Sequence, residues 1–261
     1  VAKLKDSWVL IIATLLMLQP YEWINFACAL QHPEVTPANP ASWAYFGKMG
    51  EYIPKDSFID TVVGNLTNGR PAVFNWSWEN GRVFQTLSLF MLGMLAGRKG
   101  LFKESDSNIR FWKKALVISL VAFIPLYQAK TNVGTWYTSE ALIRPLSVIL
   151  SSWANLAFMI FLVSSFVLLF RTSLFNKALN LLAPIGRMSL SNYIIQSILG
   201  SFIYYGFGLG MYQFTGATHC LIIGICLAIL QGIFSTWWLH VHKQGPLESL
   251  WHKATWARAD K

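Results

Sequence analysis

Charged residues are scarce in this sequence. Asp, Glu, Lys and Arg make up 13% of its 261 residues, whereas a soluble domain carries about 25%. Hydrophobic residues make up 54%, and they form runs near the length of about 20 residues that a bilayer-spanning helix needs. The runs 146–170 and 217–239 contain no Asp, Glu, Lys or Arg at all. The shortage of charge therefore argues against a soluble globular protein and predicts an all-α integral membrane protein.

Residue patterns that carry enzyme chemistry are also missing. Cys28, Cys220 and Cys226 all lie in apolar stretches, and no pair has metal-site spacing with a histidine nearby. His240 and His242 resemble a metal-binding pair only weakly, because no carboxylate cluster completes the set. The sequence has no Walker loop, dinucleotide fingerprint, zinc motif or Ser–His–Asp order. We therefore expect no metal ion and no covalently bound cofactor, and the catalytic residues stay unknown.

Apolar runs predict a bundle of about six transmembrane helices. The predicted spans are 8–30, 83–98, 112–129, 146–170, 184–206 and 217–240. The second span is short, because its apolar part from Val83 to Gly97 gives about 22 Å of helix at ~1.5 Å per residue, against a hydrocarbon core of ~30 Å. Pro125 predicts a kink in the third span.

The net charge of +9 is explained by orientation in a membrane. The basic residues lie in short loops and form no continuous stripe, so we expect no nucleic-acid partner. With both termini in the cytoplasm, fifteen of the 21 Lys and Arg fall inside, and six fall outside: Lys48, Lys55, Arg70, Arg82, Lys130 and Arg144. The positive-inside rule therefore predicts a multi-pass protein of a bacterial inner membrane with both termini cytoplasmic.

Two regions lie outside the predicted spans. Residues 31–81 form a proline-punctuated extracytoplasmic loop, long enough to carry a function. In the tail 245–261, Pro246 suits a first helical position and Glu248 a first turn, and apolar residues recur at helical spacing. The tail is therefore predicted to form a helix in the cytoplasmic interface. We treat residues 1–261 as a single transmembrane domain.

Polar residues of the fifth span are the main candidates for a site. A helix would place four of them on one face: Ser189, Asn192, Tyr193 and Gln196. Because burying a neutral amide without a partner costs a few kcal/mol, these side chains are not expected to face lipid. Either they hold helices together, with Ser197 and Gly200 allowing a close approach, or they line a polar cavity for a ligand.

Several charged residues are further candidates. Arg187, at the cytoplasmic entrance of the fifth span, is either an interface anchor or a clamp for a phosphate or carboxylate, which a guanidinium matches in geometry. Four residues are predicted at the outer level, as an ion-pair cluster or as an extracytoplasmic binding rim: Glu79, Arg82, Glu140 and Arg144. Glu22 lies in the first apolar run, where ionisable residues are functional candidates by default, although Pro20 indicates that the helix breaks there.

Two ordered motifs carry a family resemblance. Residues 186–193 read Gly-Arg-Met-Ser-Leu-Ser-Asn-Tyr and are followed by Gln196-Ser197, and residues 245–248 read Gly-Pro-Leu-Glu. Both resemble motifs of the YeiB-like family of bacterial inner-membrane proteins, whose C-terminal half is catalogued as domain of unknown function number four hundred and eighteen. The glycines of 93–101 and 205–210 also fit the family. The resemblance covers about residues 83–256.

The family pattern also has departures and gaps in this chain. His252 stands where the family usually has Arg, and Ser249 where it often has Trp. Members usually begin with an Asp-x-x-Arg-Gly segment and further helices that are absent here. The resemblance therefore implies that the chain is the C-terminal part of a longer protein.

A wider resemblance bears on function. The family is distantly similar to transmembrane acyltransferases, which pass an acyl group from a cytosolic donor to an extracytoplasmic acceptor. That similarity implies an acyl-coenzyme A donor near Arg187, an acceptor bound with the help of residues 31–81, and a catalytic His upstream of Val1. The alternative is a transporter or exporter of a small polar or amphiphilic solute that uses the same cavity.

Overall fold

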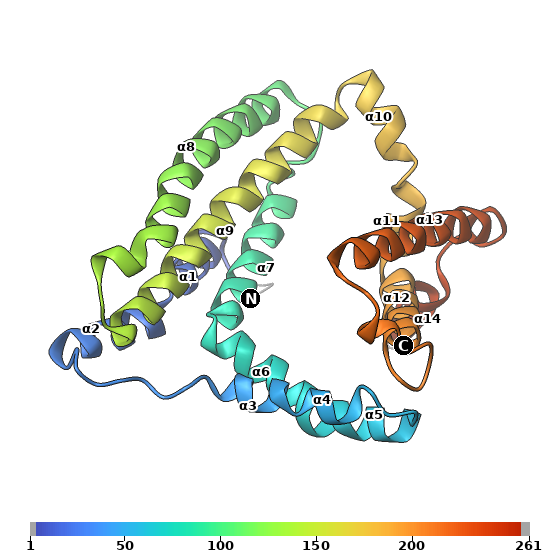
Figure 1. Ribbon diagram of the computed structural model, residues 1–261. Helices are drawn as coiled ribbons and strands as arrows, with labels where there is room; N and C mark the ends of the chain where they lie inside the picture. The colour runs from blue at the N-terminus through green and yellow to red at the C-terminus, as the bar shows by residue number, and fades with distance from the viewer. Residues whose placement is uncertain (1–3, 257–261) are drawn as a thin grey trace. The chain divides into compact units, whose positions relative to one another are not determined.

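The computed structural model describes residues 4–256, and within them every regular element is a helix (Figure 1). Three helical segments are long and apolar enough to cross a membrane, namely Asp6–Gln31, Glu140–Phe170 and Ala217–Val241. They correspond to the first, fourth and sixth predicted spans. The prediction of an all-helical fold is therefore confirmed for the described residues, and these three helices support a membrane protein. The bundle of about six spans stays a prediction. The other three predicted segments are helical but shorter or less apolar.

Contacts divide the chain into two compact units. The first unit comprises the chain up to Phe46 together with Arg70–Arg171, and the second comprises Gly47–Gly69 together with the chain from Thr172 onward. Lys3, Arg258 and Lys261, which the topology prediction assigns to the cytoplasmic side, lie outside the described residues, as does the tail from 257.

The first unit is built on two helix pairs. Its long helices are α1 (Asp6–Met17), α2 (Pro20–Gln31), α7 (Arg82–Arg98), α8 (Asp106–Trp136) and α9 (Glu140–Phe170). Helices α8 and α9 lie side by side (Figure 1), and α8 runs through Pro125 without a break in the helix. Helix α1 packs on α7 through a buried cluster of Val9, Ala13, Met91 and Leu95. The Ser88 hydroxyl donates to the Ala13 carbonyl at 2.7 Å across this pair.

The first predicted span is broken at Gln19, which separates α1 from α2. Its backbone is left-handed, with φ 58°, and Pro20 begins α2. Proline is tolerated there because a first-turn residue needs no hydrogen-bonded N–H. The Gln19 side chain is buried, and its amide donates to the Gly81 carbonyl and to the Ser152 hydroxyl, both at 2.9 Å. These long-range hydrogen bonds hold the bend.

Large apolar side chains cover the outward faces of the long helices. On α8, for example, Val117, Ile118 and Val121 are 60%, 67% and 65% exposed. Small polar side chains lie inside instead, among them the fully buried Ser164. Extended exposed apolar surface is rare on soluble monomers, and small polar residues are typical of helix contacts in membranes. The distribution of side chains therefore agrees with a lipid environment.

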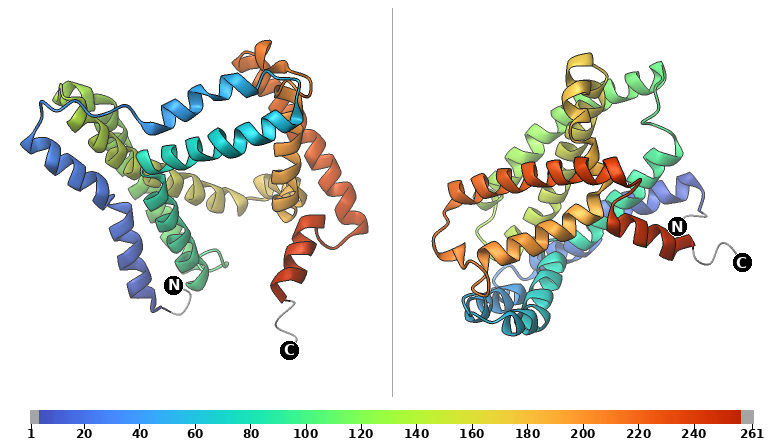
Figure 2. Two further views of the ribbon diagram at one scale, coloured as in Figure 1. Left: turned by 90° about the horizontal axis from the view of Figure 1, so that it is seen from below. Right: turned by 90° about the vertical axis from the view of Figure 1, so that its right-hand side faces the viewer.

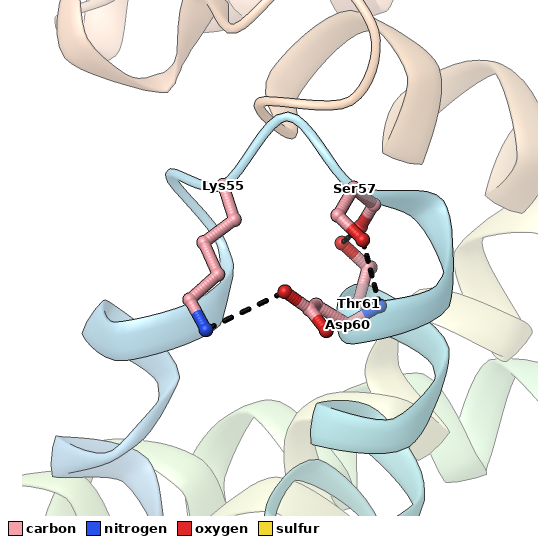
Figure 3. Close-up of polar contacts among 4 residues, drawn as sticks. All are labelled: Lys55, Ser57, Asp60 and Thr61. Carbon is pink, nitrogen blue, oxygen red and sulfur yellow. Dashed lines mark hydrogen bonds and ion pairs between the residues drawn. The ribbon is translucent and has the colours of Figure 1, made fainter.

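The region predicted as a long loop is largely helical. It contains α3 (Ala41–Gly47), α4 (Met49–Tyr52), α5 (Phe58–Gly64), the π-helix η1 (Asn65–Gly69) and α6 (Arg70–Glu79). Figure 3 shows how α5 begins: the Ser57 hydroxyl accepts from the Asp60 amide at 3.2 Å. The Thr61 hydroxyl donates to the Ser57 carbonyl at 3.0 Å, and Lys55 pairs with Asp60 at 3.4 Å. A serine N-cap of this kind stabilises even a short helix.

The second unit gathers the remaining helices. They are α10 (Ser173–Asn180), α11 (Ala183–Arg187), α12 (Ser189–Tyr204), the 3-10 helix η2 (Met211–Gln213), α13 (Ala217–Val241) and α14 (Pro246–Trp256) (Figure 2). The segment Gly47–Gly69 packs against the turn that follows α12. There the Gly206 amide donates to the Ile53 carbonyl at 2.8 Å, and the rings of Phe58 and Phe207 meet edge to face at 5.3 Å.

Candidate functional site

The fifth predicted span is divided at Met188. Helix α11 ends at Arg187 and α12 begins at Ser189, with Met188 fully buried between them. This division leaves the first backbone N–H groups of α12 without partners inside their own helix. The N-terminus of α12 therefore needs acceptors from elsewhere in the chain.

Glu248 supplies those acceptors from the start of α14. One carboxylate oxygen accepts from the Leu190 amide at 2.7 Å and from the Ser191 amide at 3.0 Å. The other oxygen accepts from the Ser191 hydroxyl at 2.5 Å. The Ser191 hydroxyl oxygen in turn accepts from the Leu247 amide at 3.1 Å. The two sequence motifs that carry the family resemblance are thus joined by a reciprocal set of hydrogen bonds.

These contacts also set the charge of Glu248. Partial burial alone raises the pKa of this carboxyl group, but the hydrogen bonds from the Ser191 side chain and from backbone amides outweigh it. The pKa of Glu248 therefore lies below its usual value of 4.5. The resulting carboxylate at the N-terminus of α12 is also favoured by the helix dipole.

Gly245 is required where α13 and α14 connect. A side-chain carbon on Gly245 would overlap the Glu248 carboxylate and lie 3.0 Å from the Ser191 hydroxyl. The glycine of the Gly-Pro-Leu-Glu motif therefore leaves room for the contact between its own glutamate and α12.

Asn192 fastens α12 to α13. Its side-chain amide donates to the Ser235 hydroxyl at 2.9 Å and to the Ile185 carbonyl at 3.2 Å. The Gln231 amide donates to the Asn192 carbonyl at 3.0 Å. The three side chains of this network, Asn192, Gln231 and Ser235, are all buried. This network is the kind of interhelical bonding expected where a polar group cannot meet water.

The other members of the predicted polar face lie differently. Ser189, Tyr193 and Gln196 are exposed, so of the four residues only Asn192 is buried. A side-chain carbon added at Gly200 would meet nothing within 4 Å, so no close helix approach occurs there among the described residues.

Arg187 borders a cavity of about 670 Å³ within the second unit. Its lining residues come from the α11–α12 junction, the α13–α14 connection and α14: Arg187, Leu190, Gln244, Glu248, Trp251, His252, Thr255 and Trp256. The Arg187 guanidinium donates to the Lys243 carbonyl at 3.1 Å. Among the described residues no carboxylate lies within ion-pair distance of it. The cavity, here called the Arg187 cavity, thus combines a cation with two tryptophans.

A second cavity, of about 620 Å³, lies within the first unit and contains two of the four predicted rim residues. Glu79 and Arg144 line it; Glu140 pairs with Arg144 at 3.3 Å. Arg82 does not line it and donates instead to the Gln85 side chain at 2.8 Å, with its guanidinium over the Trp76 ring. The structure therefore brings together three of the four rim residues.

Comparison with known proteins identifies a family whose match includes both motifs. Residues 96–258 match the model of a family described as "Protein of unknown function (DUF418)". The chain belongs to this family. No solved structure matches it.

Curated relatives cover different shares of the chain. It is 30% identical over 173 residues to the "Uncharacterized protein YxaH" of Bacillus subtilis, covering 65% of this chain and 39% of that protein. It is 35% identical over 74 residues to the "Uncharacterized protein YeiB" of Escherichia coli, covering 28% of this chain and 19% of that protein. An "Uncharacterized 39.9 kDa protein in amylase 3'region" of Bacillus acidopullulyticus is 26% identical over 194 residues, covering 68% of this chain and 54% of that protein. The chain thus spans about a fifth to just over half of these relatives.

The position of Glu248 is predictable from the sequence, but its contact with α12 is not. The Gly-Pro-Leu-Glu motif predicts that α14 begins at Pro246 with Glu248 in its first turn, and the structure confirms both. The sequence does not show that this carboxylate also caps the N-terminus of α12. The sequence feature that could have indicated this contact is the occurrence of two motifs some sixty residues apart, each with polar residues at the start of a helix.

Proposed function

We propose that this chain forms part of a bacterial inner-membrane, acyltransferase-like protein, in which the Arg187 cavity binds an anionic acyl donor such as an acyl-coenzyme A. The observation that supports it is the Arg187 guanidinium at a cavity with no carboxylate ion-paired to it among the described residues. Glu248 does line the cavity, but its carboxylate is held by the N-terminus of α12. A phosphate group matches the free edge of a guanidinium well.

The size and walls of the cavity suit such a donor. Ligand sites commonly have volumes of about 300–1,000 Å³ and combine apolar walls with a few polar groups. Here Trp251 and Trp256 offer flat apolar surfaces, and Gln244 and His252 offer hydrogen-bonding groups. In this proposal residues 31–81 contribute to the acceptor side, and the polar face of α12 contributes to the passage between the two.

The proposal requires the Arg187 cavity to face the cytoplasm. Six crossings with both termini inside would put fifteen of the 21 basic residues on that side. In a variant without native cysteines, Glu104→Cys should be protected from a membrane-impermeant thiol reagent in intact cells, and Asp56→Cys should be labelled. Labelling after cell lysis controls for the reactivity of each position. Labelling of position 104 with protection of position 56 would reverse the orientation and put the cavity on the wrong side for a cytosolic donor.

Donor binding is tested by replacing Arg187. Arg187→Lys keeps the charge but loses the bidentate fork, so it should weaken binding of acetyl-coenzyme A by roughly 5- to 160-fold, the equivalent of about 1–3 kcal/mol for a charged hydrogen bond. Isothermal titration calorimetry on the purified protein in detergent measures this. The control is Lys253→Ala, which removes a positive charge from α14 at a position that does not line the cavity.

The calorimetry separates the alternatives. Lys253→Ala should bind the thioester as the wild type does, and Arg187→Lys should keep the wild-type unfolding temperature. A wild-type protein that binds no thioester, or an Arg187→Lys variant that binds it equally well, contradicts the donor site. That outcome favours the transport of a small polar or amphiphilic solute.

A further inference from the structure

A carboxylate with no ion-pair partner among the described residues lines the cavity of the first unit. Glu22, in the first turn of α2, lines the cavity and is only 6% exposed. Its one hydrogen-bond partner among the described residues is the Asn25 side-chain amide, which donates to it at a long 3.4 Å. No Lys, Arg or His of the described residues lies within ion-pair distance of it. A buried carboxylate with so little compensation is energetically unfavourable, and in a membrane helix it is a candidate functional residue.

The other charged groups around this cavity are already engaged. The Glu79 carboxylate accepts from the Ser42 amide at 3.1 Å and from the Ser42 hydroxyl at 2.5 Å, at the start of α3. Arg144 donates to the Ala38 carbonyl at 2.8 Å and pairs with Glu140 at 3.3 Å. Glu22 is therefore the lining charge whose interactions are least satisfied, so it sets the chemistry of a ligand.

Two aromatic rings also line this cavity. Tyr21 and Trp78 line the cavity and pack against each other with ring centroids 5.4 Å apart. Aromatic faces attract an ammonium group, most strongly where water is excluded. A carboxylate beside such rings is complementary to an organic ammonium ion and unfavourable for an anion.

We propose that this cavity, the Glu22 cavity, binds a small organic molecule through a protonated amine, with Glu22 as the counter-ion. The cavity volume of about 620 Å³ accommodates a molecule with an apolar or aromatic body beside the amine. The site goes beyond donor binding and stands whether or not the Arg187 cavity binds a thioester.

The test compares two probes that differ in charge. Benzylamine is protonated at neutral pH, and benzyl alcohol is its neutral counterpart of similar size. Binding of each to the purified protein in detergent is measured by calorimetry. We expect the wild-type protein to prefer benzylamine at least tenfold, and Glu22→Gln, which keeps the shape and removes the charge, to abolish that preference.

Matched variants test whether the preference for benzylamine depends on the charge of Glu22. Glu34→Gln removes an exposed carboxylate of the same region that does not line the cavity, and it should bind like the wild type. Arg187→Lys should also leave benzylamine binding unchanged. Glu22→Asp, which keeps the charge, serves if Glu22→Gln fails to fold, and it should retain a preference for the amine. A wild-type protein without any preference for benzylamine, or a Glu22→Gln variant that keeps it, would overturn the proposal.

Discussion

Glu248→Ala should lower the free energy of unfolding of the purified protein by about 2 kcal/mol. The carboxylate accepts two backbone amides and one hydroxyl at the N-terminus of α12, and a hydrogen bond to a charged group contributes roughly 1.5–3 kcal/mol. The loss stays near the lower part of that range because Glu248 is only half-buried and water replaces some of the bonds. Thermal unfolding in detergent measures it. The control is Glu104→Ala, an exposed carboxylate in a connection, which should change the midpoint little.

The loss of stability caused by Glu248→Ala should depend on pH. The folded-state pKa of Glu248 lies below 4.5. The stabilisation by this carboxylate is therefore fully present at pH values above its unfolded-state pKa, and it disappears as the pH falls through its folded-state pKa. The stability difference between the wild type and Glu248→Ala should therefore be constant from about pH 8 to 5 and shrink below about pH 4.5. A difference that grows on acidification would contradict the assignment of Glu248 as a charged cap.

The sequence was sufficient for those parts of the fold that depend on local composition. Runs free of charge identify α9 and α13, and the order Gly-Pro-Leu-Glu identifies the start of α14. Pro20 indicated a break in the first span, since proline favours the first turn of a new helix. These features follow from residues near one another in the chain.

Features that depend on distant residues were not predictable in the same way. The buried bonds of Gln19 to Gly81 and Ser152 join positions far apart in the chain. Helix periodicity alone put Ser189, Asn192, Tyr193 and Gln196 together, yet only Asn192 finds buried partners, because Gln231 and Ser235 of α13 face it alone. Likewise, the helices within residues 31–81 were hidden by prolines and glycines that lie at their ends and between them.

At the two candidate cavities, too, contacts between distant residues were not predictable from the sequence. Arg187 and the rim residues were identifiable as charged groups near membrane edges, but their partners were not. The structure adds that Glu79 caps α3 and that Glu22 has no ion-pair partner among the described residues. A carboxylate's role thus follows from what it contacts, which a single sequence does not specify.

Gly206→Ala should destabilise the second unit by about 3 kcal/mol, toward the upper end of the cost of overpacking. A side-chain carbon at Gly206 would overlap the backbone carbonyl of Pro54, and backbone moves less readily than a side-chain tip. The substitution should also disturb the hydrogen bond from the Gly206 amide to Ile53. The segment Gly47–Gly69 would then separate from the turn after α12.

Two measurements distinguish this local separation from a general loss of folding. Thermal unfolding in detergent should show the lower midpoint, and limited trypsin digestion should cut faster at Lys48 and Lys55, the basic residues of the separated segment. Gly200→Ala is the matched control, because the added carbon meets nothing within 4 Å and alanine favours a helix interior by about 0.5–1 kcal/mol. It should be as stable as the wild type or slightly more so. A Gly206→Ala variant with the wild-type midpoint and unchanged cleavage at Lys48 and Lys55 would show that this contact does not hold the segment in place.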